Sequence, residues 1–154
     1  MKIGIASDHH GIKIKQELIN YLNKKGNEVV NYGPDTTDSV DYPEFAFKIG
    51  NAIKNEEIDL GILICKTGIG MSIAANKVKC VRCAKVTNTK EARLTRQHND
   101  ANVIAISADE PLFKLKDIID VFVRTKFSGE ERHQRRIDLI NNYKKWQLKL
   151  FYIL

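Results

Sequence analysis

The stretch Ile58-Asp-Leu-Gly-Ile-Leu-Ile64, continued by Cys65-Lys-Thr-Gly-Ile-Gly70 and Met71-Ser-Ile-Ala-Ala-Asn-Lys77, decides the fold of this chain. Its first segment is an apolar run of strand length, and its last has the small and apolar residues of a helix. A buried strand that passes through a short turn into a helix is one unit of an α/β fold. The turn is a natural anion site, because free N–H groups and the positive end of the helix dipole face it.

This turn also carries side chains that suit proton transfer. The helix field favours a thiolate over a thiol at Cys65, so this residue is a candidate base or nucleophile. Gly68 and Gly70 let the backbone come close to a ligand. We therefore expect small-molecule chemistry through a developing oxyanion at residues 65–70.

Strand and helix patterns alternate along the rest of the chain. We expect strands at 2–6, 28–31, 58–64, 81–84 and 102–106, and helices at 12–25, 43–54, 69–77, 89–97, 111–124 and 131–148. Residues 32–42 are a predicted loop. The pattern predicts a Rossmann-like α/β fold, a three-layer sandwich with a five-stranded, mostly parallel sheet. We expect one domain over 1–154, with an apolar tail at 148–154 that docks on the core or covers a subunit partner.

Composition narrows the class of protein. No apolar run approaches the roughly 20 residues that span a bilayer, and the first ten residues lack a signal-peptide layout, so we expect a cytoplasmic protein without a membrane partner. Three cysteines fit free thiols better than disulfides. The net charge of +6 falls entirely within residues 81–154, which carry fifteen Lys/Arg against nine Asp/Glu. Either this is a solvated basic surface, or the partner is an anion such as a phosphorylated metabolite or nucleic acid.

Polar side chains follow or precede several predicted strands. Asp8 and His9 come after the first strand, where a carboxylate beside an imidazole suits hydroxyl binding or proton transfer, although the pair is equally suited to capping the first helix. His98 and Asn99 precede the fifth strand, where an ordinary helix exit is the alternative. We expect these residues to gather with Cys65 at the strand ends, where open α/β sheets bind ligands.

Two further patterns bear on ligands. Arg132 and Arg136 are four residues apart and share a helix face, which suits a phosphate, with a solvated basic face as the alternative. Familiar cofactor motifs fail: the turn lacks the third glycine of a dinucleotide site and the Lys-Ser/Thr of a P-loop. A single Cys80-Val-Arg-Cys83 is a weak zinc signal, and no His/Glu spacing indicates a catalytic metal. We expect neither a cofactor nor a metal.

At these residues the chain resembles a known family. The matching stretches are 5–9, Tyr32-Gly33, 41–43, 61–77, 94–103 and 132–136, of which Ile69-Gly-Met-Ser-Ile-Ala-Ala-Asn-Lys77 and Thr95-Arg-Gln-His-Asn-Asp-Ala-Asn102 are the most specific. They are similar to the type B ribose-5-phosphate isomerases, within the wider family that includes the galactose-6-phosphate isomerase subunits. The resemblance implies a metal-free aldose–ketose isomerase of the pentose phosphate pathway, which interconverts ribose 5-phosphate and ribulose 5-phosphate through an enediolate.

The resemblance also implies roles for individual residues. Cys65 matches the proton-transferring thiol and His98 the ring-opening residue, while Thr67 and the amides of 66–70 match an oxyanion hole. The positions that match substrate-binding residues are Asp8, His9, Lys66, Gly68, Ile69, Gly70, Asn99, Arg132 and Arg136. The family forms dimers with shared sites, so we expect a homodimer or a dimer of dimers, with the Cys65 half and the His98 half drawn from different chains.

Two positions depart from the family pattern. Lys66 stands where glycine is usual, and Asp109 stands where an arginine usually contacts the phosphate. Three alternatives stay open: an isomerase of a six-carbon sugar phosphate such as allose 6-phosphate or galactose 6-phosphate, a sugar-phosphate-binding protein without turnover, and, from the basic half of the chain, a nucleic-acid-binding domain. The presence of both the thiol and the His-Asn-Asp stretch favours a self-sufficient isomerase over a galactose-6-phosphate isomerase subunit, each of which lacks one of the two. We expect no nucleic-acid partner.

Overall fold

The computed structural model describes the backbone of residues 1–153 and the side chains of residues 1–143. Five parallel strands form one sheet in the order β2-β1-β3-β5-β4. The strands are β1 (Lys2–Ser7), β2 (Glu28–Asn31), β3 (Leu60–Cys65), β4 (Cys83–Lys85) and β5 (Val103–Ser107). The helices are α1 (Ile12–Lys24), α2 (Tyr42–Lys54), α3 (Ile69–Ala75), α4 (Thr89–Asn99), α5 (Leu112–Arg124) and α6 (Glu131–Ile153).

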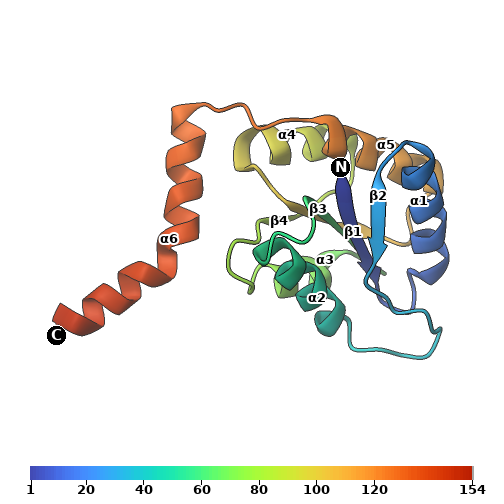
Figure 1. Cartoon of the computed structure of the whole chain (residues 1–154), viewed down its shortest axis with the longest axis horizontal. Helices are drawn as coiled ribbons and strands as arrows, with labels where there is room; N and C mark the ends of the chain where they lie inside the picture. Colours follow the sequence, from blue (N-terminus) through green and yellow to red (C-terminus); the bar gives the residue numbers. More distant parts are fainter. Residues whose placement is uncertain (154) are drawn as a thin grey trace.

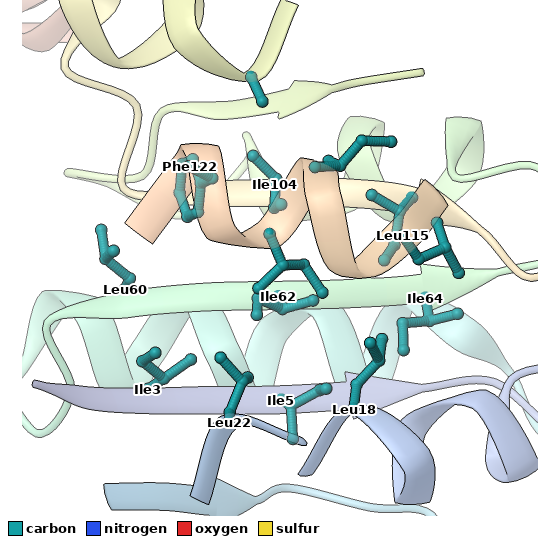
Figure 2. Packing of buried hydrophobic residues seen from close by; sticks show 14 of the residues in the cluster. Ile3, Ile5, Leu18, Leu22, Leu60, Ile62, Ile64, Ile104, Leu115 and Phe122 are labelled. Atoms are coloured by element: carbon teal, nitrogen blue, oxygen red, sulfur yellow. The ribbon is translucent and has the colours of Figure 1, made fainter. Parts of the chain in front are cut away.

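The helices enclose the sheet as a three-layer sandwich, which confirms the predicted fold class (Figure 1). On one face, α1 and α5 pack on β1, β3 and β5, and the isoleucines of alternate strand positions interdigitate with Leu18, Leu115 and Phe122 (Figure 2). On the other face, α2 and α3 pack around Ile49, Leu63 and the fully buried Met71. Because both faces are covered, the central strands read as continuous apolar runs.

Most predicted bounds differ from the observed ones, and three of these differences have a cause in the structure. The strand expected at 58–64 begins at Leu60 and includes Cys65, because Cys65 still pairs with Ser107 of β5. The helix expected to reach residue 77 ends at Ala75, since the side chain of Asn76 bonds the backbone N–H and C=O of Cys83. That same contact fixes β4 at Cys83–Lys85 instead of 81–84.

Helix α6 leaves the α/β body (Figure 1). Within its described part, Leu139, Ile140 and Tyr143 are exposed. The apolar tail expected at residues 148–154 lies outside the side chains that the structure describes. Among the described residues, no helix is long and apolar enough to cross a membrane.

Candidate active site

The turn between β3 and α3 holds the Cys65 thiol against backbone N–H groups. Cys65 is the last residue of β3 and is 5% exposed, and its Sγ lies 3.0 Å from the backbone nitrogen of Gly68, which donates to it. The backbone N–H of Ile69, the first residue of α3, donates to Thr67 Oγ1 at 3.2 Å. The predicted juxtaposition of a thiol, a hydroxyl and the start of a helix is therefore present, with a donor already directed at the sulfur.

Glycine is required twice in this turn. Gly68 has φ of +78°, and a Cβ there would lie 3.1 Å from the backbone of Ile106. A Cβ on Gly70 would lie 2.5 Å from the ring of Tyr42. The first glycine allows the left-handed turn and its approach to β5, and the second lets the start of α2 pack on α3.

The two departures from the family pattern fit this turn without strain. Lys66 is not among the residues with positive φ, so a lysine there is compatible with the backbone. Its carbonyl accepts a hydrogen bond from Ser107 Oγ at 2.6 Å, and Ser107 Oγ in turn accepts one from the Asp109 backbone N–H at 3.1 Å. Lys66 and Asp109 therefore flank the Cys65 turn as parts of one hydrogen-bonded corner.

Asp8 and His9 lie beside this turn on the neighbouring strand end. The Asp8 backbone N–H donates to the carbonyl of Ile64 at 2.9 Å, which ties the end of β1 to the residue before Cys65. Asp8 is buried, and its Oδ1 accepts from the His10 backbone N–H at 2.9 Å. Neither Asp8 nor His9 caps α1, because Gly11 takes the N-cap position without a side-chain hydrogen bond. The structure therefore leaves these side chains free of the capping role that sequence alone allowed.

A buried lysine supports this edge and was missed by sequence reasoning. Lys15 is 1% exposed, and its Nζ donates to the carbonyl of Pro34, to Asn31 Oδ1 at 3.0 Å and to Asp35 Oδ1 at 3.3 Å. Burial lowers the pKa of Lys15, which its interaction with Asp35 opposes. The pKa of Asp35 is lowered by hydrogen bonds from Asn31 and Lys15. These bonds fix the start of the loop whose Val40 N–H donates to His9 Nδ1 at 3.3 Å.

A second group of candidate residues lies where α4 ends and α6 begins. His98 stacks on His133 with ring centroids 4.2 Å apart and planes 17° from parallel. His133 is buried, and its Nε2 has no hydrogen-bond partner among the described residues. Burial lowers the pKa of His133, and the nearby His98 and Arg132 lower it further. Arg132 Nε donates to Glu130 at 2.8 Å and thereby lowers the pKa of Glu130.

The two groups lie at opposite edges of the sheet within one chain. Val103 pairs with Gly61 where β3 and β5 begin, and Ser107 pairs with Cys65 where they end. Four strand residues at about 3.3 Å each put these edges ~13 Å apart. His98 and Asn99 end the helix that leads into Val103, so they lie at the amino edge. The expectation that all candidate residues gather at one set of strand ends is therefore wrong for one chain.

The candidate residues form two groups, one at each edge of the sheet. The carboxyl-edge group comprises Asp8, His9, Cys65, Lys66, Thr67, Gly68, Ile69 and Gly70. The amino-edge group comprises His98, Asn99, Arg132, His133 and Arg136. Sequence reasoning found every member except His133, whose stacking on His98 has no signal in spacing alone.

The chain is similar to several known proteins. Residues 3–140 match the model of a family described as Ribose/Galactose Isomerase. A putative sugar phosphate isomerase of Bacillus subtilis is 43% identical over 150 residues, which cover 96% of this chain and all of that protein. The solved ribose-5-phosphate isomerase B of Clostridium thermocellum superposes with a TM-score of 0.92 at 44% identity, covering 96% of this chain and 99% of that one.

A further solved relative carries a ligand. The ribose-5-phosphate isomerase B of Mycoplasma genitalium, solved with bound ribulose 5-phosphate, superposes with a TM-score of 0.88 at 46% identity. The match covers 94% of this chain and 96% of that one.

Proposed function

Since the chain belongs to the ribose/galactose isomerase family, we propose that it interconverts ribose 5-phosphate and ribulose 5-phosphate. The observation that carries the proposal is the Cys65 thiol, which receives the Gly68 N–H at the start of a helix. A base is needed beside a group of fixed donors for enolisation of a sugar phosphate, and this turn provides both. Solved relatives named as ribose-5-phosphate isomerases, one with bound ribulose 5-phosphate, support the substrate.

The carboxyl-edge group performs the proton transfer. Cys65 thiolate removes the proton from C2 of the open-chain aldose, and the electron pair of that C–H bond forms the C1–C2 double bond. The negative charge moves to O1, where the backbone N–H groups of residues 66–70 and the Thr67 hydroxyl stabilise it. A proton passes from O2 to O1, and Cys65 returns its proton to C1 to give the ketose. Asp8 and His9 bind sugar hydroxyls beside the thiol.

The amino-edge group opens the ring and holds the phosphate. His98 moves a proton to or from the ring oxygen of the furanose, Asn99 binds the sugar, and Arg132 and Arg136 hold the phosphate. Both guanidiniums lie on exposed helix positions, and Arg136 has no ion pair among the described side chains. No metal is needed for these roles, because the thiol moves the proton and the amides carry the charge.

The two groups meet across a homodimer with shared sites. A two-fold axis can bring the amino edge of one chain to the carboxyl edge of its partner, so that each site takes residues from both chains. Exposed apolar side chains near both groups support such a contact, namely Ile69 and Ile73 on α3, and Leu139 and Ile140 on α6. We further propose that the enzyme works in the cytoplasm, within the pentose phosphate pathway.

Turnover measured with excess chelator tests the activity. We expect the wild type to convert ribose 5-phosphate into ribulose 5-phosphate, and the Cys65→Ala variant to lose this activity. Cys80→Ala is the matched control, because Cys80 is an exposed cysteine outside the site. A wild type that binds ribose 5-phosphate saturably without converting it would contradict the proposal.

Mixing two inactive variants tests the shared site. Cys65→Ala and His98→Asn chains are unfolded together, refolded and compared with each variant refolded alone. Random pairing makes half of the dimers mixed, and each mixed dimer has one site with both residues intact, so about a quarter of wild-type activity returns. A mixture that stays inactive would place both residues of a site in the same chain.

A further inference from the structure

The turn after β1 places two imidazoles and a carboxylate together. The ligand atoms of Asp8, His9 and His10 all lie within 4.8 Å of one another. His10 Nδ1 lies 3.2 Å from Asp8 Oδ2, and the ring centroids of His9 and His10 are 4.1 Å apart. No other group of three such side chains in the described part of the chain comes this close.

From this cluster we propose that Asp8, His9 and His10 bind a divalent transition cation such as Zn²⁺, and that the bound cation blocks the sugar site. Two imidazole nitrogens and one carboxylate form a ligand set that suits Zn²⁺ and its neighbours, whereas Ca²⁺ and Mg²⁺ take oxygen ligands. One coordination position remains for water. The proposed catalysis uses no cation, so this site is inhibitory.

Burial and charge favour a cation between Asp8 and His10. The Asp8 side chain is 8% exposed, while the His10 side chain is 46% exposed and gives the cation access from solvent. The Asp8 carboxylate supplies the negative charge that offsets the positive end of α1, which begins at Ile12. His10 Nδ1 and Asp8 Oδ2 lie 3.2 Å apart, so both atoms can approach one cation.

His9 joins the site by giving up a contact with the loop. Its Nδ1 accepts the Val40 N–H at 3.3 Å, and a neutral imidazole has one lone pair. The cation therefore takes the His9 lone pair from Val40, a long hydrogen bond that is weak at this distance. Since Asp8 and His9 also bind the sugar in the proposed function, a cation held by them excludes the substrate. This blocking rests on the proposed function, whereas cation binding itself does not.

Calorimetric titration with ZnCl₂ tests the site directly. The titration compares Cys65→Ala protein with the Cys65→Ala/His10→Ala double variant, because removing the thiol excludes it as the ligand. We expect one saturable Zn²⁺ per chain, with affinity at least about tenfold lower once His10 is replaced, since even outer-shell residues contribute that much. Sites that involve Cys80 or Cys83 contribute equally to both proteins. Identical isotherms, or the absence of saturable binding, would overturn the proposal.

Inhibition of the wild type tests the blocking. We expect Zn²⁺ to lower the isomerase rate, with inhibition relieved by more substrate and weakened in the His10→Ala variant, which keeps its activity without Zn²⁺. Equal inhibition of both proteins would overturn the blocking. A protein without any turnover would refute the proposed function alone, because calorimetry still decides whether the cation binds.

Discussion

The two edge groups differ in how the chain holds them. The carboxyl-edge group is fixed by backbone geometry: Cys65 ends a central buried strand, and Gly68 is packed against the backbone of Ile106. The amino-edge group consists of side chains on the ends of α4 and α6, held by one stacked histidine pair and an exposed Arg132–Glu130 pair. In the proposed mechanism, proton transfer from carbon uses fixed backbone donors at the end of a buried strand. Phosphate binding depends on long cationic side chains and tolerates a looser setting.

The two groups differ most in how replacing one of their residues affects the reaction started from each sugar phosphate. Ribulose 5-phosphate has no free C5 hydroxyl and cannot close a furanose ring, whereas ribose 5-phosphate is mostly cyclic. We expect His98→Asn to lower the initial rate from ribose 5-phosphate by ~10²–10⁴-fold, because conversion then waits for uncatalysed ring opening, and to affect the initial rate from ribulose 5-phosphate much less. Cys65→Ala removes proton transfer and lowers both directions alike. Initial rates measured from each sugar phosphate check this, and equal losses for His98→Asn would contradict its ring-opening role.

Replacing Gly68 tests the rigidity of the carboxyl edge. Gly68→Ala and Gly26→Ala each place a side chain at positive φ, at +78° and +86°, which costs ~1–2 kcal/mol. Only at Gly68 does the new Cβ meet backbone, at 3.1 Å, while nothing lies within 4 Å at Gly26. We expect Gly68→Ala to lose ~1–3 kcal/mol more in unfolding free energy than its control. Urea unfolding of the two variants measures this difference. Equal losses of unfolding free energy would show that the backbone around Gly68 can move to accept the new Cβ.

The carboxyl edge was predictable from sequence because its signals are local. An apolar run, a glycine turn and a helix follow one another without a break, so the place of Cys65 needs only the neighbouring residues and the parallel order of strands. The predicted bounds of β3 differ from the observed ones by one or two residues. The strand extends to Cys65 because Cys65 pairs with Ser107, which is distant in sequence. Local pattern does not contain that pairing.

The residues of the amino edge were found from the sequence, but the expectation that they gather with Cys65 overlooked the direction of the strands. Position 98 precedes a strand, so in a parallel sheet it lies at the opposite edge from a residue that ends one. Lys15 and His133 were missed for a different reason. Each is a polar residue on a helix whose burial depends on a segment distant in sequence, the loop at Pro34 and Asp35 for Lys15 and the end of α4 for His133.

Lys15 links the core to the carboxyl edge, and its replacement sharpens the contrast between the groups. Lys15→Met keeps a long unbranched side chain and removes the hydrogen-bond donor to Asn31 and the Pro34 carbonyl. We expect a loss of ~1–3 kcal/mol in unfolding free energy, because these acceptors lose their partner. Lys13→Met, on the exposed side of α1, is the matched control and stays near wild type. Thermal unfolding of both variants measures the difference in stability. Unchanged stability in Lys15→Met would mean that the loop is held by other contacts.

We expect acid to lower the unfolding free energy of the chain through His133. Its ordinary pKa of 6.5 is lowered in the fold by burial, by the stacked His98 and by Arg132 and Arg136, against the opposing effect of Glu130. A lowered pKa means that the unfolded chain takes up a proton before the folded chain does. Unfolding free energy therefore falls as the pH drops below 6.5 toward the folded pKa, and the effect is absent above that range.

The variant His133→Phe keeps the ring packed on His98 and removes its titration. We expect its unfolding free energy, measured by urea from pH 8 to pH 5, to depend less on pH than that of the wild type. If His133→Phe retained the full slope, the acid-sensitive element would lie outside the amino-edge group, the reverse of what the burial of His133 beside His98 indicates.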